Sequence, residues 1–147
     1  ELNAIVMENA KGEKFITFFI AKYNQVTKML NYINAGHNPP VLLSGNTTTL
    51  LRTGCTGLGM LDEIPRIREG LVHLQPASTV VCYTDGVVEV ENNAGLDFGT
   101  GSLEQIMMNH RSASMEELNA QIIRNLDQFR EDRSYIDDIT LFSARFF

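Results

Sequence analysis

Residues 79–89 read TVVCYTDGVVE, and this stretch decides the fold. Its first six residues are almost all apolar or β-branched, which predicts a strand buried on both faces. The strand ends at Asp85-Gly86, where an ionisable side chain follows an apolar segment. Because carboxylates are rarely buried without a partner, Asp85 needs N–H donors, a cation or solvent. Asp-Gly is also a common hairpin turn, so the residues alone leave a cation site and a plain turn both open.

A second pair of carboxylates, Asp137-Asp138, precedes the last apolar stretch, residues 139–146. That stretch predicts a closing strand, and adjacent aspartates before it repel each other unless positive charge lies nearby. Carboxylate oxygens from separate strand ends suit Mg²⁺ or Mn²⁺ better than zinc, which favours His and Cys. A solvated turn with Asp137 capping a backbone N–H is the other reading of these residues.

A tight polar turn, NAGHNPP at residues 34–40, is the third feature that carries chemistry. Its His37 has the side chain of a general acid. A lone His in a turn of Gly, Asn and Pro is more typical of a structural hydrogen bond, and both readings stay open.

The strands around these motifs are predicted to form hairpins. Residues 15–23 and 29–34 are rich in β-branched and aromatic side chains and predict a first hairpin. A second hairpin is predicted from residues 41–44 and 47–51, which flank a Gly45-Asn46 turn. Residues 55–61 predict a loop that crosses between sheets. Residues 66–74 predict a strand with a bulge at Gly70.

Three helices are predicted. Residues 2–9 have the helical spacing of the tail of an amphipathic helix whose beginning lies outside this sequence. Ser102 with Gln105, and Ser114 with Glu117, each form a capping box that marks a helix start. The last helix carries a single apolar stripe, made of Leu118, Ile122, Leu126 and Phe129. We therefore predict one α+β domain over residues 1–147, with mostly antiparallel strands and helices packed on the sheet.

Composition narrows the class of protein. With 147 residues and 44% hydrophobic content, the chain can form a core without disulfides or metals. Its net charge is −6 and its basic residues are scattered, which argues against nucleic acid as a partner. No apolar run is long enough for a membrane segment, and the first residues of this sequence do not have the pattern of a signal peptide. Cys55 and Cys82 lack C-x-x-C partners, so a reducing cytoplasmic location is expected.

In their order along the chain, the motifs resemble the bacterial metal-dependent Ser/Thr phosphatases of the PPM superfamily, in its SpoIIE/RsbU branch. The resemblance covers essentially the whole chain and rests on FITF at 15–18, NAGHNPP at 34–40, LG at 58–59, YTDGVVE at 83–89, FG at 98–99 and DDITL at 137–141. It implies an α-β-β-α sandwich and two Mn²⁺ or Mg²⁺ ions. It also implies that a metal-bound water hydrolyses phosphoserine or phosphothreonine in a protein.

The resemblance also assigns roles to residues. It makes Asp85 and Asp137 metal ligands, with Asp138 contributing through a water. Gly86, His37 and Asn38 fall at motif positions that shape the site, and Glu89 at another. One departure matters, because the family's first motif contains a Gly-Asp whose aspartate bridges both metals, and here no Asp precedes Asp62.

That departure leads us to expect an N-terminally truncated, C-terminal portion of the phosphatase domain, which is inactive on its own. Its unpaired strand edges favour pairing with a second copy as a homodimer, or an exchange of elements between copies. The family further implies a phosphorylated anti-sigma-factor antagonist as substrate and an upstream sensor domain. Two alternatives remain: a catalytically inactive regulatory or interaction module of the same fold, and a generic α+β binding domain whose Asp-Gly and Asp-Asp are only turns.

Overall fold

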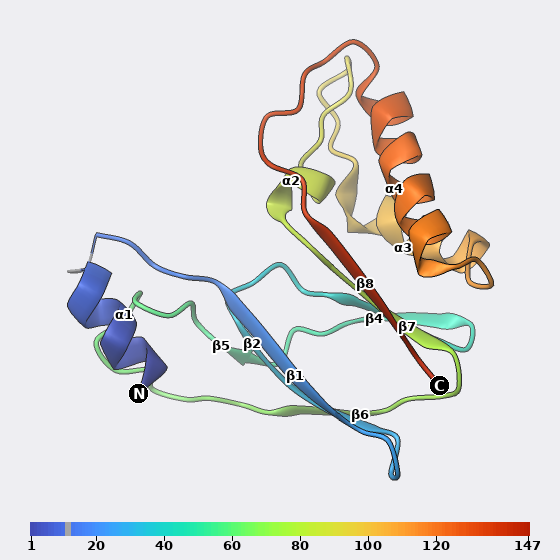
Figure 1. Ribbon diagram of the computed structural model, residues 1–147. Coiled ribbons are helices and arrows are strands. Elements are labelled where there is room, and N and C mark those ends of the chain that lie inside the picture. Colours follow the sequence, from blue (N-terminus) through green and yellow to red (C-terminus); the bar gives the residue numbers. More distant parts are fainter. Residues whose placement is uncertain (11–12) are drawn as a thin grey trace. The chain divides into compact units, whose positions relative to one another are not determined.

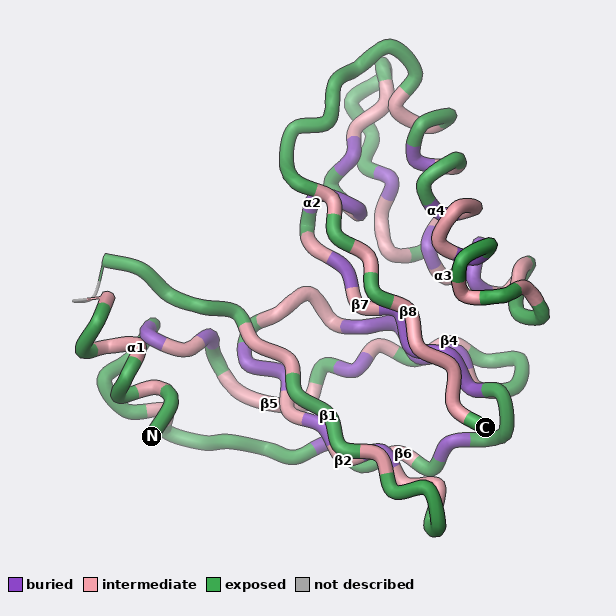
Figure 2. The backbone as a smooth tube through the Cα atoms, viewed as in Figure 1, coloured by how far each residue is buried: buried purple, intermediate pink, exposed green. Residues whose placement is uncertain are grey.

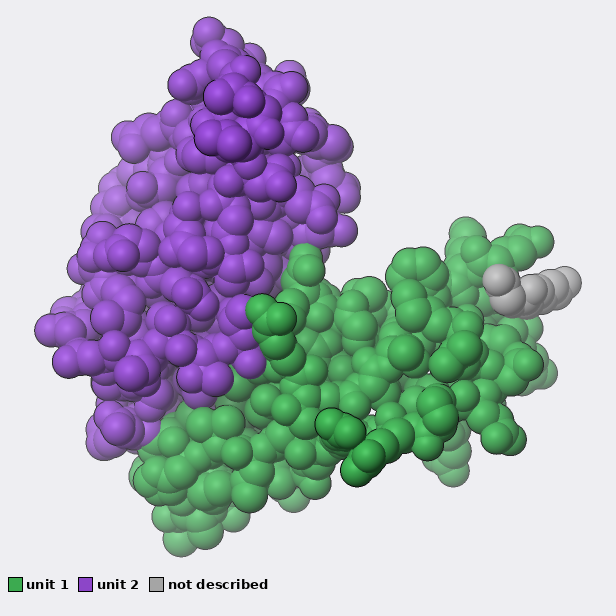
Figure 3. All heavy atoms as spheres, turned by 180° about the vertical axis from the view of Figure 1, so that it is seen from behind, with its two compact units in different colours: residues 1–39, 51–74 green, residues 40–50, 75–147 purple. Residues whose placement is uncertain are grey.

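The computed structural model describes residues 1–10 and 13–147, and these divide into two compact units (Figure 1). Unit 1 comprises residues 1–39 and 51–74, and unit 2 comprises residues 40–50 and 75–147 (Figure 3). Each unit is built on its own four-stranded sheet. The predicted α+β class with mostly antiparallel strands is confirmed.

Unit 1 is a sheet centred on β2, with one helix. Its elements are α1 (Leu2–Ala10), β1 (Phe18–Asn24), β2 (Met29–Ala35), β5 (Gly54–Cys55) and β6 (Gly70–His73). The hairpin predicted from residues 15–23 and 29–34 is confirmed, since β1 pairs antiparallel with the whole of β2. On its other side β2 pairs with β6 in antiparallel and with β5 in parallel orientation.

Two predictions in unit 1 are wrong in detail. Gly70 forms no bulge, because it pairs with Tyr32 in regular register. A Cβ at Gly70 would lie 2.2 Å from the Tyr32 ring, so the glycine makes room for that ring. The loop at residues 55–61 does not cross between sheets either, because β5 and β6 both pair with β2.

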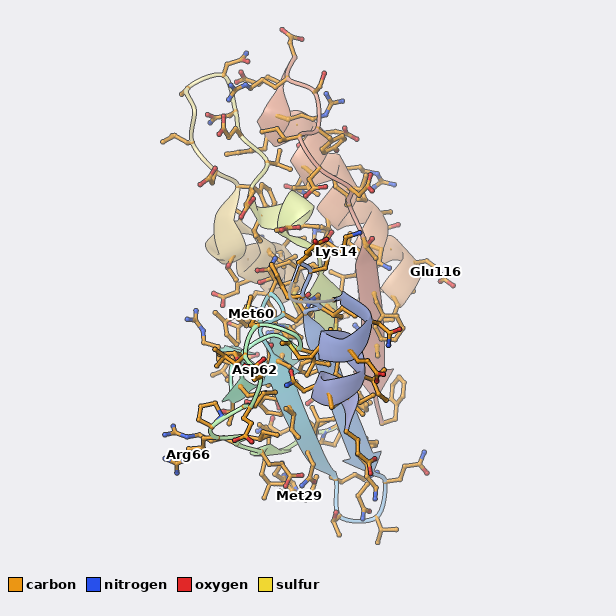
Figure 4. The ribbon with its side chains drawn as sticks, turned by 90° about the vertical axis from the view of Figure 1, so that its left-hand side faces the viewer. Lys14, Met29, Met60, Asp62, Arg66 and Glu116 are labelled. Atoms are coloured by element: carbon orange, nitrogen blue, oxygen red, sulfur yellow. The ribbon has the colours of Figure 1, made fainter. Side chains whose placement is uncertain are left out.

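This loop instead lies against α1. Figure 4 shows Met60 and Asp62 on the loop beside the helix. Asn3 of α1 donates from its Nδ2 atom to the carbonyl oxygens of Leu61 and Asp62, at 3.0 and 3.2 Å, and accepts from the Gly59 amide at 2.9 Å. Side-chain hydrogen bonds hold α1, in which no residue is buried.

Unit 2 is an antiparallel sheet in the order β4-β3-β7-β8, with three helices. Its elements are β3 (Val41–Ser44), β4 (Thr47–Leu50), β7 (Ser78–Tyr83), α2 (Asp85–Val88), α3 (Gly99–Asn109), α4 (Met115–Arg130) and β8 (Leu141–Phe146). The second predicted hairpin and the buried strand at residues 79–84 are confirmed. Among the described residues, no helix combines the length and the apolar character needed to cross a bilayer.

The core of unit 2 lies between this sheet and helices α3 and α4 (Figure 2). The predicted stripe of α4 is confirmed: three of its four residues are buried and Phe129 packs against them. Apolar residues of β3 and β7 complete the core, notably Val41, Leu43, Val81 and Tyr83. Burial of this kind contributes about 1.5–3 kcal/mol per large apolar side chain.

The two capping predictions have different outcomes. Ser114 caps α4 as predicted, because its Oγ accepts the Glu117 amide at 3.1 Å. Ser102 is not a cap: α3 already begins at Gly99, and the Ser102 hydroxyl donates to the Phe98 carbonyl.

Candidate metal centre

Asp85 and the Asp137-Asp138 pair lie at the same edge of the sheet of unit 2. Asp85 directly follows Thr84 at the end of β7, and the pair shortly precedes β8. These strands are antiparallel neighbours with Tyr83 opposite Leu141, so the end of one meets the start of the other. Figure 1 shows the loop before β8 passing beside α2.

Thr84 holds the two segments together beyond the strands. Its amide donates to the Thr140 carbonyl at 3.2 Å, and its Oγ1 accepts the Thr140 amide at 2.9 Å. The same hydroxyl donates to the Asp138 carbonyl at 2.9 Å. The Thr84 side chain therefore links the backbone next to Asp85 to the backbone at Asp138 and Thr140.

Gly86 lets the segments approach closely. A Cβ at this position would lie 2.6 Å from the Asp138 carbonyl oxygen and 3.2 Å from that of Asp137. The turn reading of Asp-Gly is wrong in detail, because Asp85 begins the single-turn helix α2 rather than a hairpin. The glycine serves a close contact between backbones.

The three predicted metal-ligating carboxylates are exposed. One oxygen of Asp85 accepts the Gly86 amide at 3.1 Å, and one of Asp137 accepts the Asp138 amide at 2.7 Å. Among the residues that the structure describes, none of the three forms an ion pair. No arginine or lysine therefore competes with a cation for them in the described part of the chain.

A cavity of about 470 Å³ opens at this edge, and Asp137 and Gly86 line it. Further acidic residues line it as well, namely Glu89, Glu91 and Asp97, whereas Asp85 and Asp138 do not. Sequence reasoning noted Glu89 as a motif position and missed the other two. A signal for them was present, because the Asn-Ala-Gly segment between Glu91 and Asp97 favours a tight turn, and those two residues form a β-bridge.

His37 and Asn38 belong to unit 1, whereas the aspartates belong to unit 2. The His37 amide donates to Oδ1 of the buried Asn34 at 2.8 Å, and its ring Nδ1 lies 3.3 Å from the Thr17 hydroxyl. Gly36, between Asn34 and His37 in the chain, has φ +69°, and a Cβ there would lie 2.8 Å from the Gly57 amide nitrogen. These contacts support a structural role for the turn. The general-acid role of His37 stays a prediction.

Neither cysteine is placed as a nucleophile. Both are free thiols. Burial raises the pKa of Cys82 to about 11 and raises that of Cys55. The thiolate is the reactive form, so a Cys82 that stays protonated near neutral pH is unsuited to attack a phosphoryl group.

The donor chemistry at this edge fits Mn²⁺ or Mg²⁺, which prefer carboxylate and carbonyl oxygens. The described residues contain no group of three or more His, Cys, Asp or Glu side chains that could hold a metal ion. The metal-ligating role of Asp85 and Asp137 therefore stays a prediction.

The loop that carries Asp137 is attached to the end of α4 and to residues 91–92. Asp127 of α4 accepts from Arg130 Nε and from the Tyr135 hydroxyl, both at 2.9 Å. Arg130 also donates from Nη1 to the carbonyl of Arg133 at 2.5 Å, and its guanidinium lies 4.8 Å from the centre of the Tyr135 ring. The Arg133 side chain in turn pairs with Glu91 and donates to the Asn92 carbonyl.

Asp127→Asn is expected to reduce the acid sensitivity of unit 2. The hydrogen bonds from Arg130 and Tyr135 lower the pKa of Asp127. A carboxyl with a lowered pKa in the folded state adds stability above its unfolded pKa of about 3.9, and this is lost as pH falls through the lowered value. The Tm of the variant should therefore fall less steeply than that of wild type between about pH 5 and 2. Thermal unfolding followed by circular dichroism across that range tests this, with Asp132→Asn as the control, and equal slopes would contradict it.

Comparisons with known proteins bear on this arrangement. The model of the family described as Stage II sporulation protein E (SpoIIE) matches residues 1–147. Protein IcfG of Synechocystis sp. is 28% identical over 142 residues, which are 95% of this chain and 22% of that protein.

Solved structures share the fold. The RsbU and RsbW domains of Rv1364c from Mycobacterium tuberculosis match with TM-score 0.76 and 21% identity, over 97% of this chain and 39% of that one. The SiaA-PP2C domain of Pseudomonas aeruginosa matches with TM-score 0.71 and 22% identity, over 82% and 47%. The phosphatase domain of the cell fate determinant SpoIIE from Bacillus subtilis gives TM-score 0.66 and 12% identity, over 88% and 58%. The chain thus spans less than two thirds of each of these proteins.

Proposed function

Because this chain belongs to the SpoIIE family of phosphatases, we propose that it contributes Asp85 and Asp137 as ligands for divalent metal in a protein serine/threonine phosphatase. The observation that carries the proposal is the contact between the two segments at Gly86. Asp138 has a secondary role beside Asp137. Bound Mn²⁺ or Mg²⁺ would supply Lewis-acid contacts to the phosphoryl oxygens.

The residues of this chain prepare the site electrostatically. Asp85 and Asp137 each use one oxygen to accept a neighbouring amide, and the described residues give their second oxygens no hydrogen-bond donor. Without a cation, these carboxylates and the acidic cavity beside them would repel a phosphoryl group. We infer that the reaction needs no protein nucleophile, in agreement with the raised pKa of Cys82.

The substrate and partners are also proposals. We propose a phosphorylated regulatory protein of the anti-sigma-factor antagonist type as substrate, and an upstream sensor domain and a second copy of the chain as partners. Support comes from the solved M. tuberculosis chain, which contains RsbU and RsbW domains. We further propose that both units belong to one domain, since the family model runs through both.

Metal dependence tests the proposed function. The full-length protein is expected to hydrolyse a phosphoserine peptide with Mn²⁺ or Mg²⁺ and to lose this turnover in EDTA, with recovery when Mn²⁺ is restored. Phosphate release is the measurement. Turnover that persists in EDTA would contradict the metal role. The 147 residues alone are expected to show little activity, because the part of the chain that the structure describes brings no three potential metal ligands together.

A non-catalytic regulatory module is the second candidate function. It is favoured by one observation, the lack of a three-residue metal group among the described residues. Calorimetric titration of the full-length protein with Mn²⁺ separates the two candidates. Mn²⁺ binding together with phosphate release supports the phosphatase, whereas neither is expected of the module.

A further inference from the structure

The loop that carries Asp137 and Asp138 is not held by burial. Every residue from 131 to 138 is exposed, and Ile136 has 76% of its surface exposed. A segment with so little apolar contact has low local stability unless hydrogen bonds fix it. The hydrogen bonds of this loop therefore decide where the Asp137 carboxylate lies.

Those hydrogen bonds fall at the two ends of the loop. Toward β8, Thr84 binds the Asp138 carbonyl and the Thr140 amide. Toward α4, Arg130 binds the Arg133 carbonyl, and Asp127 binds the Tyr135 hydroxyl. Tyr135 is thus the last fixed side chain before Asp137, and it is two residues away.

Arg130 and Asp127 both contact Tyr135. They pair with each other through the Nε–Oδ1 hydrogen bond at 2.9 Å. The Tyr135 ring lies under the guanidinium while its hydroxyl reaches the Asp127 carboxylate that Arg130 also binds. A cation–π contact and a charge-assisted hydrogen bond thus act on one side chain.

We propose that Tyr135, Arg130 and Asp127 are positioning residues for the metal centre, which keep the loop at Asp137 beside the α2 segment, where its backbone approaches Gly86. The proposal rests on the proposed function, in which Asp137 is a metal ligand. Replacing residues that orient a metal ligand costs metal affinity or activity, and because these three residues do not line the acidic cavity, we expect the effect on affinity. The expected signature is therefore a higher metal requirement with little change in turnover once metal is saturating.

Tyr135→Phe in the full-length protein tests the proposal, because it keeps the ring and removes only the hydroxyl. We expect Mn²⁺ to bind ~3- to 10-fold more weakly, below the ~10- to 100-fold loss seen when a direct partner of a ligand is removed. The Mn²⁺ concentration for half-maximal phosphate release should rise by the same factor. Asp127→Asn keeps an acceptor oxygen but removes the charge that strengthens its hydrogen bonds from Tyr135 and Arg130, so it should weaken Mn²⁺ binding in the same direction. In the double variant the two effects should not add, because both act on the hydrogen bond between residues 127 and 135.

Arg124→Gln is the matched control, since it removes another exposed ion pair of α4, with Glu117. It should bind Mn²⁺ like wild type. If Tyr135→Phe and Asp127→Asn lower the Tm but leave the metal requirement unchanged, the residues are only structural and the positioning role is wrong. In that case, loss of Mn²⁺ binding in Asp137→Asn would leave the proposed function standing. If wild type binds no Mn²⁺, or Asp137→Asn binds it normally, the proposed function fails and the positioning role with it.

Discussion

Asp85→Asn and Asp137→Asn are each expected to lower metal-dependent phosphate release by the full-length protein more than about a hundredfold, beyond the ~10- to 100-fold range for groups that only support a ligand. Asparagine keeps the oxygen that accepts the neighbouring amide, at Gly86 or Asp138, so the local backbone should be retained. What is lost is the negative charge that a divalent cation needs. Phosphate release at several Mn²⁺ concentrations is the measurement.

Asp132→Asn is the control for these variants. Asp132 is exposed on the same loop as Asp137, and it does not line the acidic cavity. This variant should keep wild-type activity, and all three should unfold at similar temperatures. Wild-type turnover in both Asp85→Asn and Asp137→Asn would show that the ligands are elsewhere.

The strands and the last helix could be predicted because their sequence patterns are also their burial patterns. The apolar run at 79–84 forms β7, and the stripe of α4 faces the core. The start of α3 could not be predicted from its capping box. Gly99 and Gly101 are poor helix formers, and the helix nevertheless begins there, where the buried Phe98 packs edge-on against Phe129 at 5.4 Å. Tertiary packing outweighs local preference at that point.

The candidate site was predictable in its placement but not in its details. Two aspartates at the ends of separate apolar stretches predicted a shared sheet edge, and the pairing of β7 with β8 brings them there. Tyr135 gave no such signal, because its role depends on Asp127, eight residues away on α4. A contact between two single side chains produces no periodic pattern in one sequence.

The close backbone contact at Gly86 could likewise not be predicted from the sequence. Gly86→Ala should destabilise unit 2 by ~1–3 kcal/mol, the usual cost of an added group in a tightly packed position. The new Cβ would lie against the carbonyl oxygens of Asp138 and Asp137. These are backbone atoms, and they cannot move aside as the end of a flexible side chain would. The φ of Gly86 lies outside the left-handed region, so the cost comes from this contact and not from backbone strain. Urea unfolding measures it.

The α2 segment and the loop before β8 must separate to admit that methyl group, so Gly86→Ala should also weaken Mn²⁺ binding while both aspartates remain present. Gly101→Ala is the matched control, because a Cβ there meets nothing within 4 Å and the residue lies in α3. Alanine in a helix is favoured over glycine by up to ~1 kcal/mol, so the control should be as stable as wild type or more stable. Wild-type stability and Mn²⁺ affinity in Gly86→Ala would contradict this prediction. They would show that the aspartates are placed equally well when the two segments lie farther apart.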